Sequence, residues 1–89
     1  MRDIQQTSQF KKALKRMKAR SADMTLLKGI LEKLQRGESL DIRHQNHPLT
    51  GQWSGNFDCH IKPDWILIYR LTEDALILEA MGTHSDLFD

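Results

Sequence analysis

The sequence contains little cysteine, proline or glycine, and each shortage narrows what the protein can be. Cys59 is the one cysteine in 89 residues, so no internal disulfide can form and a sulfur-rich zinc site is not expected. With two prolines and five glycines, the chain has no low-complexity linker, and no Gly-rich phosphate loop of the P-loop or Rossmann type is present. Redox chemistry and these two forms of nucleotide binding are therefore not expected.

Long hydrophobic runs are also missing. No apolar stretch approaches the roughly 18 residues needed to cross a bilayer, and the polar start "MRDIQQTSQF" lacks the apolar segment of a signal peptide. Hydrophobic residues make up 39% of the chain and charged residues 28%, which is the balance of a soluble globular domain. We expect a single domain, residues 1–89, that works in the cytoplasm and has no membrane partner.

The net charge of +1 hides an uneven distribution along the chain. Residues 1–36 carry ten Lys and Arg against three Asp and Glu, a balance of +7, and residues 37–89 carry three against nine, a balance of −6. Six basic residues lie close together: Lys11, Lys12, Lys15, Arg16, Lys18 and Arg20. Such a cluster is either the solvated face of a helix or a surface that attracts nucleic-acid phosphates, and charge does not decide between the two.

The first half of the chain has the apolar spacing of two helices. Residues 2–5 are compatible with an edge strand, and Thr7 or Ser8 can cap a helix in which apolar residues recur at helical spacing. Ser21 can cap a second helix, and Gly37 supplies its end. Residues 38–51 are rich in turn formers and show no sustained period, so they predict an ordered loop.

The second half changes to the period of strands. Residues 57–61 alternate apolar and polar side chains, which places His60 on the polar face of a strand, and residues 65–71 and 75–81 are apolar on both faces. The turns at 63–64 and 72–74 are short, and residues 83–89 form a tail. This order predicts an α+β domain, β-α-α-β-β-β, in which a helical pair packs on one face of an antiparallel sheet.

Four histidines lie in the second half, and they are the main candidates for chemistry. Imidazole suits general acid-base work because its ordinary pKa of about 6.5 gives access to both protonation states near neutral pH. A zinc site built from His44, His47, His60, Asp64 and His84 is the alternative. No His-Glu-x-x-His motif supports it, and no nucleophile elbow surrounds a serine. We therefore expect no metal, and His44 has no further support as a site residue.

Several motifs occur together: "HPL" at 47–49, Trp53 with Gly55, "CHIKPDWILIY" at 59–69 and "GTHSDLF" at 82–88. Together they resemble the YafQ-like branch of the RelE/ParE superfamily of toxins from bacterial toxin–antitoxin modules. The resemblance covers nearly the whole chain. It implies a RelE-like fold and a ribosome-dependent endoribonuclease that cuts messenger RNA without a metal or other cofactor.

The resemblance also implies roles for particular residues. The positions that match the family's catalytic residues are His47, His60, Asp64 and His84, while Trp65 and Phe88 match its supporting or substrate-contacting aromatic residues. Related toxins commonly carry an arginine where this sequence has Ala80. Arg70 or Lys62 is expected to supply the missing positive charge near the substrate, or else the histidines supply it themselves.

The implied partners are messenger RNA and ribosomal RNA on the ribosome, and a cognate antitoxin that itself binds operator DNA. The basic cluster from Lys11 to Arg20 would then be the ribosome-binding surface. Two alternatives stay open: a toxin of the ParE kind that acts on DNA gyrase through protein contacts, and an RNA-binding or antitoxin-binding module without activity.

Overall fold

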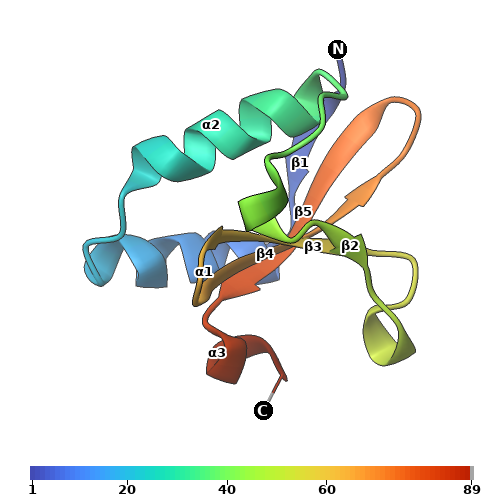
Figure 1. Ribbon diagram of the computed structural model, residues 1–89. Coiled ribbons are helices and arrows are strands. Elements are labelled where there is room, and N and C mark those ends of the chain that lie inside the picture. The colour runs from blue at the N-terminus through green and yellow to red at the C-terminus, as the bar shows by residue number, and fades with distance from the viewer. Residues whose placement is uncertain (89) are drawn as a thin grey trace.

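The computed structural model of the protein describes residues 1–88, and it contains three α-helices and five strands in that range. Two 3₁₀ turns, Ile42–His44 and Gly51–Trp53, lie in the loop before the long strands. In chain order (Figure 1), the elements are β1 Asp3–Gln6, α1 Ser8–Ala19, α2 Met24–Gln35, β2 His47–Pro48, β3 Phe57–Lys62, β4 Trp65–Leu71, β5 Ala75–Gly82 and α3 His84–Phe88.

The strands form one sheet in the order β1-β5-β4-β3-β2. The predicted α+β class and the meander of β3, β4 and β5 are confirmed, since these strands pair antiparallel. The expectation of a wholly antiparallel sheet is wrong for β1, which pairs parallel to β5 with Asp3 opposite Ala75. The helical pair separates β1 from the rest of the sheet in sequence, so β1 is free to lie beside the last strand in either direction.

The two long helices begin at side chains that cap free backbone N–H groups. The hydroxyl of Thr7 accepts a hydrogen bond from the N–H of Phe10 at 3.0 Å, as expected for α1. The cap of α2 is Asp23, whose carboxylate accepts from the N–H of Thr25 at 3.0 Å, so the prediction of Ser21 was wrong. Ser21 instead has a positive φ of 62° and belongs to the turn that ends α1.

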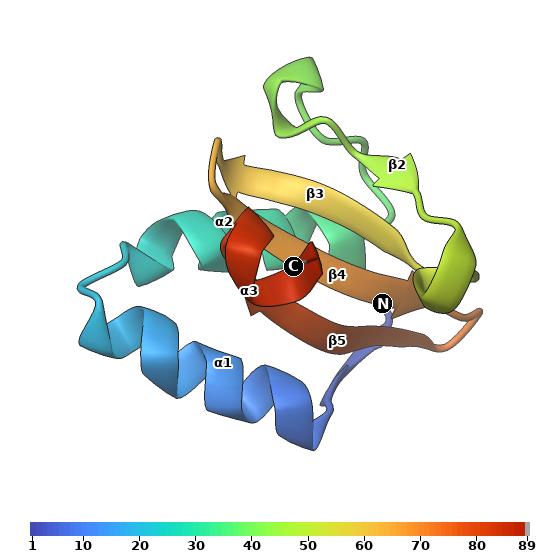
Figure 2. The ribbon, with the colours of Figure 1, turned by 90° about the horizontal axis from the view of Figure 1, so that it is seen from below.

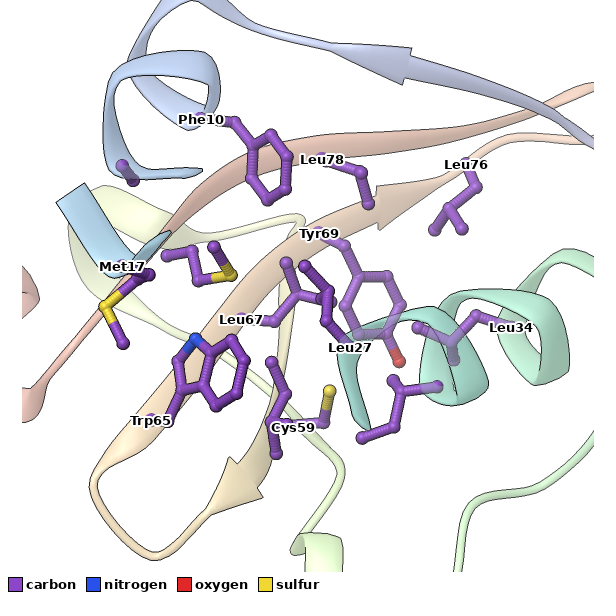
Figure 3. Packing of buried hydrophobic residues seen from close by; sticks show 14 residues of the cluster. Phe10, Met17, Leu27, Leu34, Cys59, Trp65, Leu67, Tyr69, Leu76 and Leu78 are labelled. Carbon is purple, nitrogen blue, oxygen red and sulfur yellow. The ribbon is translucent and has the colours of Figure 1, made fainter. Parts of the chain in front are cut away.

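The main core lies between the helical pair and one face of the sheet. Phe10 and Met17 from α1 and Leu27 and Leu34 from α2 point toward the β4 side chains of the same cluster, as Figure 3 shows. The side chains that β4 contributes to it alternate along the strand: Trp65, Leu67 and Tyr69. Burial of this apolar surface is the principal stabilising term for so small a domain.

The opposite face of the sheet is partly covered by α3. In Figure 2 the sheet lies between α2, which is behind it, and α3, which is in front of β4 and β5. Ile66 and Ile68 of β4 point to this second face and are almost fully buried, which confirms the prediction that β4 is apolar on both faces. The tail expected after Gly82 is thus a short helix. Within residues 1–88 no helix has the length and apolar character to cross a membrane.

Candidate active site

Three of the four histidines meet in one cleft on the sheet face that carries α3. The cleft has a volume of about 350 Å³, and it draws residues from the loop around β2, from β3 and β4, and from α3. Its lining residues are Gln45, His47, Leu49, Asp58, His60, Ile66, His84 and Phe88. Positions 47, 60 and 84, which are far apart in the sequence, therefore line a single space.

His47 and His60 are brought together by strand pairing. His47 in β2 lies opposite Asp58 in β3, and His60 follows two residues later on the same face of β3. His60 Nδ1 lies 3.1 Å from the carbonyl oxygen of Pro63, and His47 Nδ1 lies 2.8 Å from that of Gln45. A carbonyl oxygen only accepts, so each Nδ1 carries the hydrogen, and each Nε2 is left available for a substrate.

Asp58 is a member of the cleft that sequence reasoning missed. It is 4% exposed, and its Oδ1 lies 2.8 Å from His47 Nδ1. That N–H points at the Gln45 carbonyl rather than at the carboxylate, so Oδ1 makes an ionic contact without a hydrogen bond. Burial raises the pKa of Asp58, and the nearby charges of His47 and His60 partly oppose that shift. Its place on the same face as His60 was visible in the strand alternation.

His84 is held at the cleft through the backbone of α3. The Asp64 carboxylate accepts a hydrogen bond from the His84 backbone N–H at 2.8 Å. Thr83 and Asp86 form a reciprocal cap, in which each side chain accepts from the other's backbone N–H. Asp64 does not line the cleft. Asp64, which was predicted as a catalytic residue, therefore lies where it positions the turn that carries His84.

Arg16 of α1 and Arg20, which caps the end of α1, fix α3 from the other side. Arg20 Nη1 donates to Asp86 Oδ2 at 2.9 Å, Arg16 Nε lies 3.9 Å from the same oxygen, and Arg16 Nη2 donates to the carbonyl of Met81. The Arg20 guanidinium holds the pKa of Asp86 well below its ordinary value. A Cβ on Gly82 would lie 2.8 Å from the Cβ of Asp86, so glycine is required where α3 folds back on β5.

The two predicted aromatic residues occupy different environments. Phe88 lines the cleft, is 37% exposed, and packs against His84 with ring centroids 5.1 Å apart. Trp65 is 4% exposed in the main core and does not line the cleft. Trp65 therefore packs beneath the site, as predicted for a tryptophan on a strand. Of the two residues, Phe88 alone is placed to stack on a substrate.

The residues expected to replace the missing arginine lie outside the cleft. Ala80 is fully buried opposite Ile68, and Arg70 Nε lies 3.5 Å from the carboxylate of Glu79. Lys62 lies past the end of the cleft, beside Pro63. Neither Arg70 nor Lys62 therefore brings its charge into the cleft, and the second expectation, that the histidines supply the positive charge themselves, stays a prediction.

The remaining candidates are spread over the surface. The six basic residues of the predicted ribosome-binding surface are all exposed, but Arg16 and Arg20 already bind α3. His44, which had no further support as a site residue from the sequence, donates from Nδ1 to the His60 carbonyl at 2.6 Å. Among residues 1–88, no group of three or more His, Cys, Asp or Glu side chains is arranged to hold a metal ion.

Comparison with known proteins agrees with this fold. The family described as the bacterial toxin of type II toxin–antitoxin system, YafQ, matches residues 2–89. The mRNA interferase toxin YafQ of Escherichia coli K12 is 42% identical over 88 residues, which cover 98% of this chain and 96% of that protein. The chain thus belongs to the YafQ family of bacterial toxins of type II toxin–antitoxin systems.

Solved structures support the same assignment. The E. coli DinJ–YafQ toxin–antitoxin complex contains a chain that is 42% identical, with a TM-score of 0.91 and coverage of 99% of this chain and 98% of that chain. A metal-bound toxin from Helicobacter pylori is 33% identical, with a TM-score of 0.93 and coverage of 99% and 100%. The RelE-like fold and the enzyme class, an endoribonuclease, are confirmed by these matches.

Proposed function

We propose that this chain cuts messenger RNA in the decoding site of the ribosome, without a metal ion, by attack of a ribose 2′-hydroxyl on the adjacent phosphate. The observation that carries the proposal is the single cleft in which His47, His60 and His84 meet. The reaction needs a base, an acid and positive charge near the phosphate, and three imidazoles can supply all of these. DNA lacks the 2′-hydroxyl and is not a substrate by this route.

In the proposed reaction, a base takes the 2′-hydroxyl proton as the 2′-oxygen bonds to phosphorus. The bond from phosphorus to the 5′-oxygen breaks, and an acid gives that oxygen a proton, leaving a cyclic phosphate. His60 suits the base, because its Nδ1–H is bound to the Pro63 carbonyl and the neutral ring keeps Nε2 free to accept. His84 is assigned as the acid or a phosphate contact, and His47 helps to hold the phosphate.

Supporting residues complete the assignment. Asp64 and Asp86 position α3, and with it His84, while Phe88 is placed to stack on a base or ribose of the bound strand. The exposed lysines of α1 would contact ribosomal RNA phosphates, which set affinity without reading sequence. Ribosomes are cytoplasmic, so we place the protein there.

A cognate antitoxin is the proposed protein partner. The E. coli relative is described in complex with DinJ, and the family itself is defined by such modules. We expect this chain to bind its own antitoxin and to contact operator DNA only through it.

Substitution of His84 by alanine tests the catalytic assignment. We expect primer extension on ribosomes translating a defined message to show cleavage reduced at least about 100-fold, because general acid-base groups contribute about 10²–10⁴ in rate. Glu73→Ala, in the exposed turn at the far end of β5, is the matched control and should cleave normally. Toxicity that persists in a folded His84→Ala protein would favour a non-nuclease toxin, and a wild-type chain that never cuts would favour an inactive module.

A further inference from the structure

A second cavity lies beside the cleft and shares His60 with it. Its volume is about 350 Å³, and its lining comes from α2, from the 3₁₀ turn at Ile42–His44 and from the end of β3 with the turn that follows. His60 lines both this cavity and the cleft. Nothing in the proposed reaction uses the second cavity.

The lining combines positive charge with an apolar wall. Arg43, His44, His60 and Lys62 supply cationic or imidazole groups, and no carboxylate is part of the lining. Arg43 Nε lies 3.9 Å from the Asp41 carboxylate, and because this pair is largely solvent-exposed, the guanidinium is free to turn toward a ligand. A small pocket of cations around apolar surface suits a ligand that carries both a phosphate and a planar or sugar ring.

Apolar side chains form the rest of the wall. Leu26 is 38% exposed on α2, and Ile61 and Pro63 belong to the end of β3 and the turn after it. Leu26 offers the exposed part of this wall, while Ile61 is 5% exposed and forms its floor, so the wall can contact the flat face of a nucleobase or a ribose. The wall and the charges therefore fit the two parts of a nucleotide.

His44 ties this cavity to the cleft. Its Nδ1 donates to the carbonyl oxygen of His60 at 2.6 Å, so its ring is fixed against the strand residue that both cavities share. With Nδ1 bound in this way, Nε2 of His44 is left available, and His44 is part of the cavity lining. The cleft lies on the α3 face and the cavity is bordered by α2, so a strand of RNA that passes His60 would continue around the end of β3 into the second cavity.

We propose that the second cavity is a subsite for the nucleotide next to the cleavage position, in which Arg43 and Lys62 bind its phosphate and Leu26, Ile61 and Pro63 contact its base or ribose. The subsite rests on the proposed function, since it extends the RNA strand held in the cleft. Its role is binding and register rather than bond cleavage. It makes Arg43, His44 and Lys62 substrate-positioning residues.

Reversal of one charge tests the subsite. Arg43→Glu is expected to raise KM for cleavage about tenfold, because a hydrogen bond to a charged group contributes about 1.5–3 kcal/mol and 1.4 kcal/mol is tenfold. It should leave kcat unchanged. Arg36→Glu alters the net charge equally, but Arg36 lies at the end of α2 beside Glu38, outside the cavity and outside the basic cluster of α1, so its KM should stay at the wild-type value. Equal KM changes in the two variants would overturn the subsite.

A binding measurement separates failure of the subsite from failure of the proposed reaction. A trinucleotide with 2′-O-methyl groups cannot be cut, so its binding can be followed by NMR even if the protein proves not to cleave RNA. We expect it to shift the methyl signals of Leu26 and Ile61 and the ring signals of His44, and Arg43→Glu should abolish those shifts while those of Leu49 and Phe88 persist. Shifts confined to Leu49 and Phe88 in the wild-type protein would contradict the subsite.

Discussion

At the scale of single residues, the buried carboxylate of Asp58 is expected to assist cleavage and, when ionised, to destabilise the fold. Its carboxylate is buried on the sheet face beside His47 and His60, and burial raises its pKa. For an acid, a raised pKa in the folded state means that its contribution to stability is present below the unfolded-state pKa and is lost as the pH rises through the folded-state pKa. Once ionised, the group therefore weakens the fold, although it lies 2.8 Å from His47 in the cleft.

Asp58→Asn should separate these two effects. We expect cleavage at neutral pH to fall about tenfold, the effect of roughly 1.4 kcal/mol lost in stabilising the positive charge that His60 acquires when it takes the 2′-hydroxyl proton. Urea denaturation at pH 7 should give a free energy of unfolding equal to or above that of the wild-type protein, since the amide carries no buried charge. A variant that unfolds more easily and cleaves normally would show that Asp58 is a structural residue.

Single residues also show how far a sequence can predict a site. The motifs picked out His47, His60, His84 and Phe88, and the strand period placed His60 on the polar face. Asp58 was missed because it belongs to none of the motifs used. The bond from the His84 N–H to Asp64 could not be foreseen, because it depends on a backbone turn 20 residues away in sequence.

At the scale of elements, α3 depends on contacts from distant parts of the chain. It has five residues, too few for a helix that is stable alone. Arg16 and Arg20 hold it from the end of α1 and its cap, Asp64 holds its first N–H, and Gly82 makes room for Asp86. The element that carries His84 and Phe88 is therefore ordered by tertiary contacts.

Asp86→Asn is expected to loosen α3. A lowered pKa for Asp86 means that its contribution is present above the ordinary value of 3.8 and is lost as the pH falls through the folded-state pKa, so the wild-type helix is fully held at neutral pH. The variant should lose about tenfold in kcat/KM through misplacement of His84. Amide exchange at Leu87, whose N–H binds the Thr83 carbonyl, should accelerate.

A second exposed ion pair provides the control for that test. Arg36→Ala removes a pairing with Glu38 in the loop after α2, far from α3 in the chain. It should change neither cleavage nor exchange at Leu87. Unchanged exchange in Asp86→Asn would mean that the Arg20 contact does not hold the helix.

Elements with a clear period were predictable, and those without one were not. Apolar spacing located α1, α2 and the long strands, because each buries a full face. The parallel pairing of β1 is a property of the whole sheet, and α3 is too short to show a helical period. The start of α2 was misplaced because Ser21 and Asp23 are both good caps, and only the turn geometry chooses between them.

At the scale of the whole molecule, the charge asymmetry has two uses. The lysines of α1 are exposed, whereas Arg16 and Arg20 pair with Asp86 in the acidic half of the chain. Part of the basic cluster thus helps to hold α3, which brings His84 and Phe88 to the cleft. The four remaining lysines, Lys11, Lys12, Lys15 and Lys18, are the ones left for ribosomal RNA.

Ribosome binding should consequently weaken steeply with salt. Four phosphate contacts predict a slope of log K against log salt of about −3 to −4, and Lys11→Gln with Lys15→Gln should make it shallower by about 1.5–2. Co-sedimentation with ribosomes across a salt range that leaves them intact measures this slope. A slope near zero, or one unaffected by the two substitutions, would rule out α1 as the binding surface.

The central claim is that histidines of one cleft act as acid and base on a single phosphodiester. The most direct test is cleavage of a ribosome-bound message whose scissile 5′-oxygen is replaced by sulfur, because a thiolate leaves without protonation. His84→Ala should cut this message nearly as fast as the wild-type protein while failing on the ordinary one, and His60→Ala should fail on both. If neither variant is rescued by the sulfur, the acid-base account is contradicted.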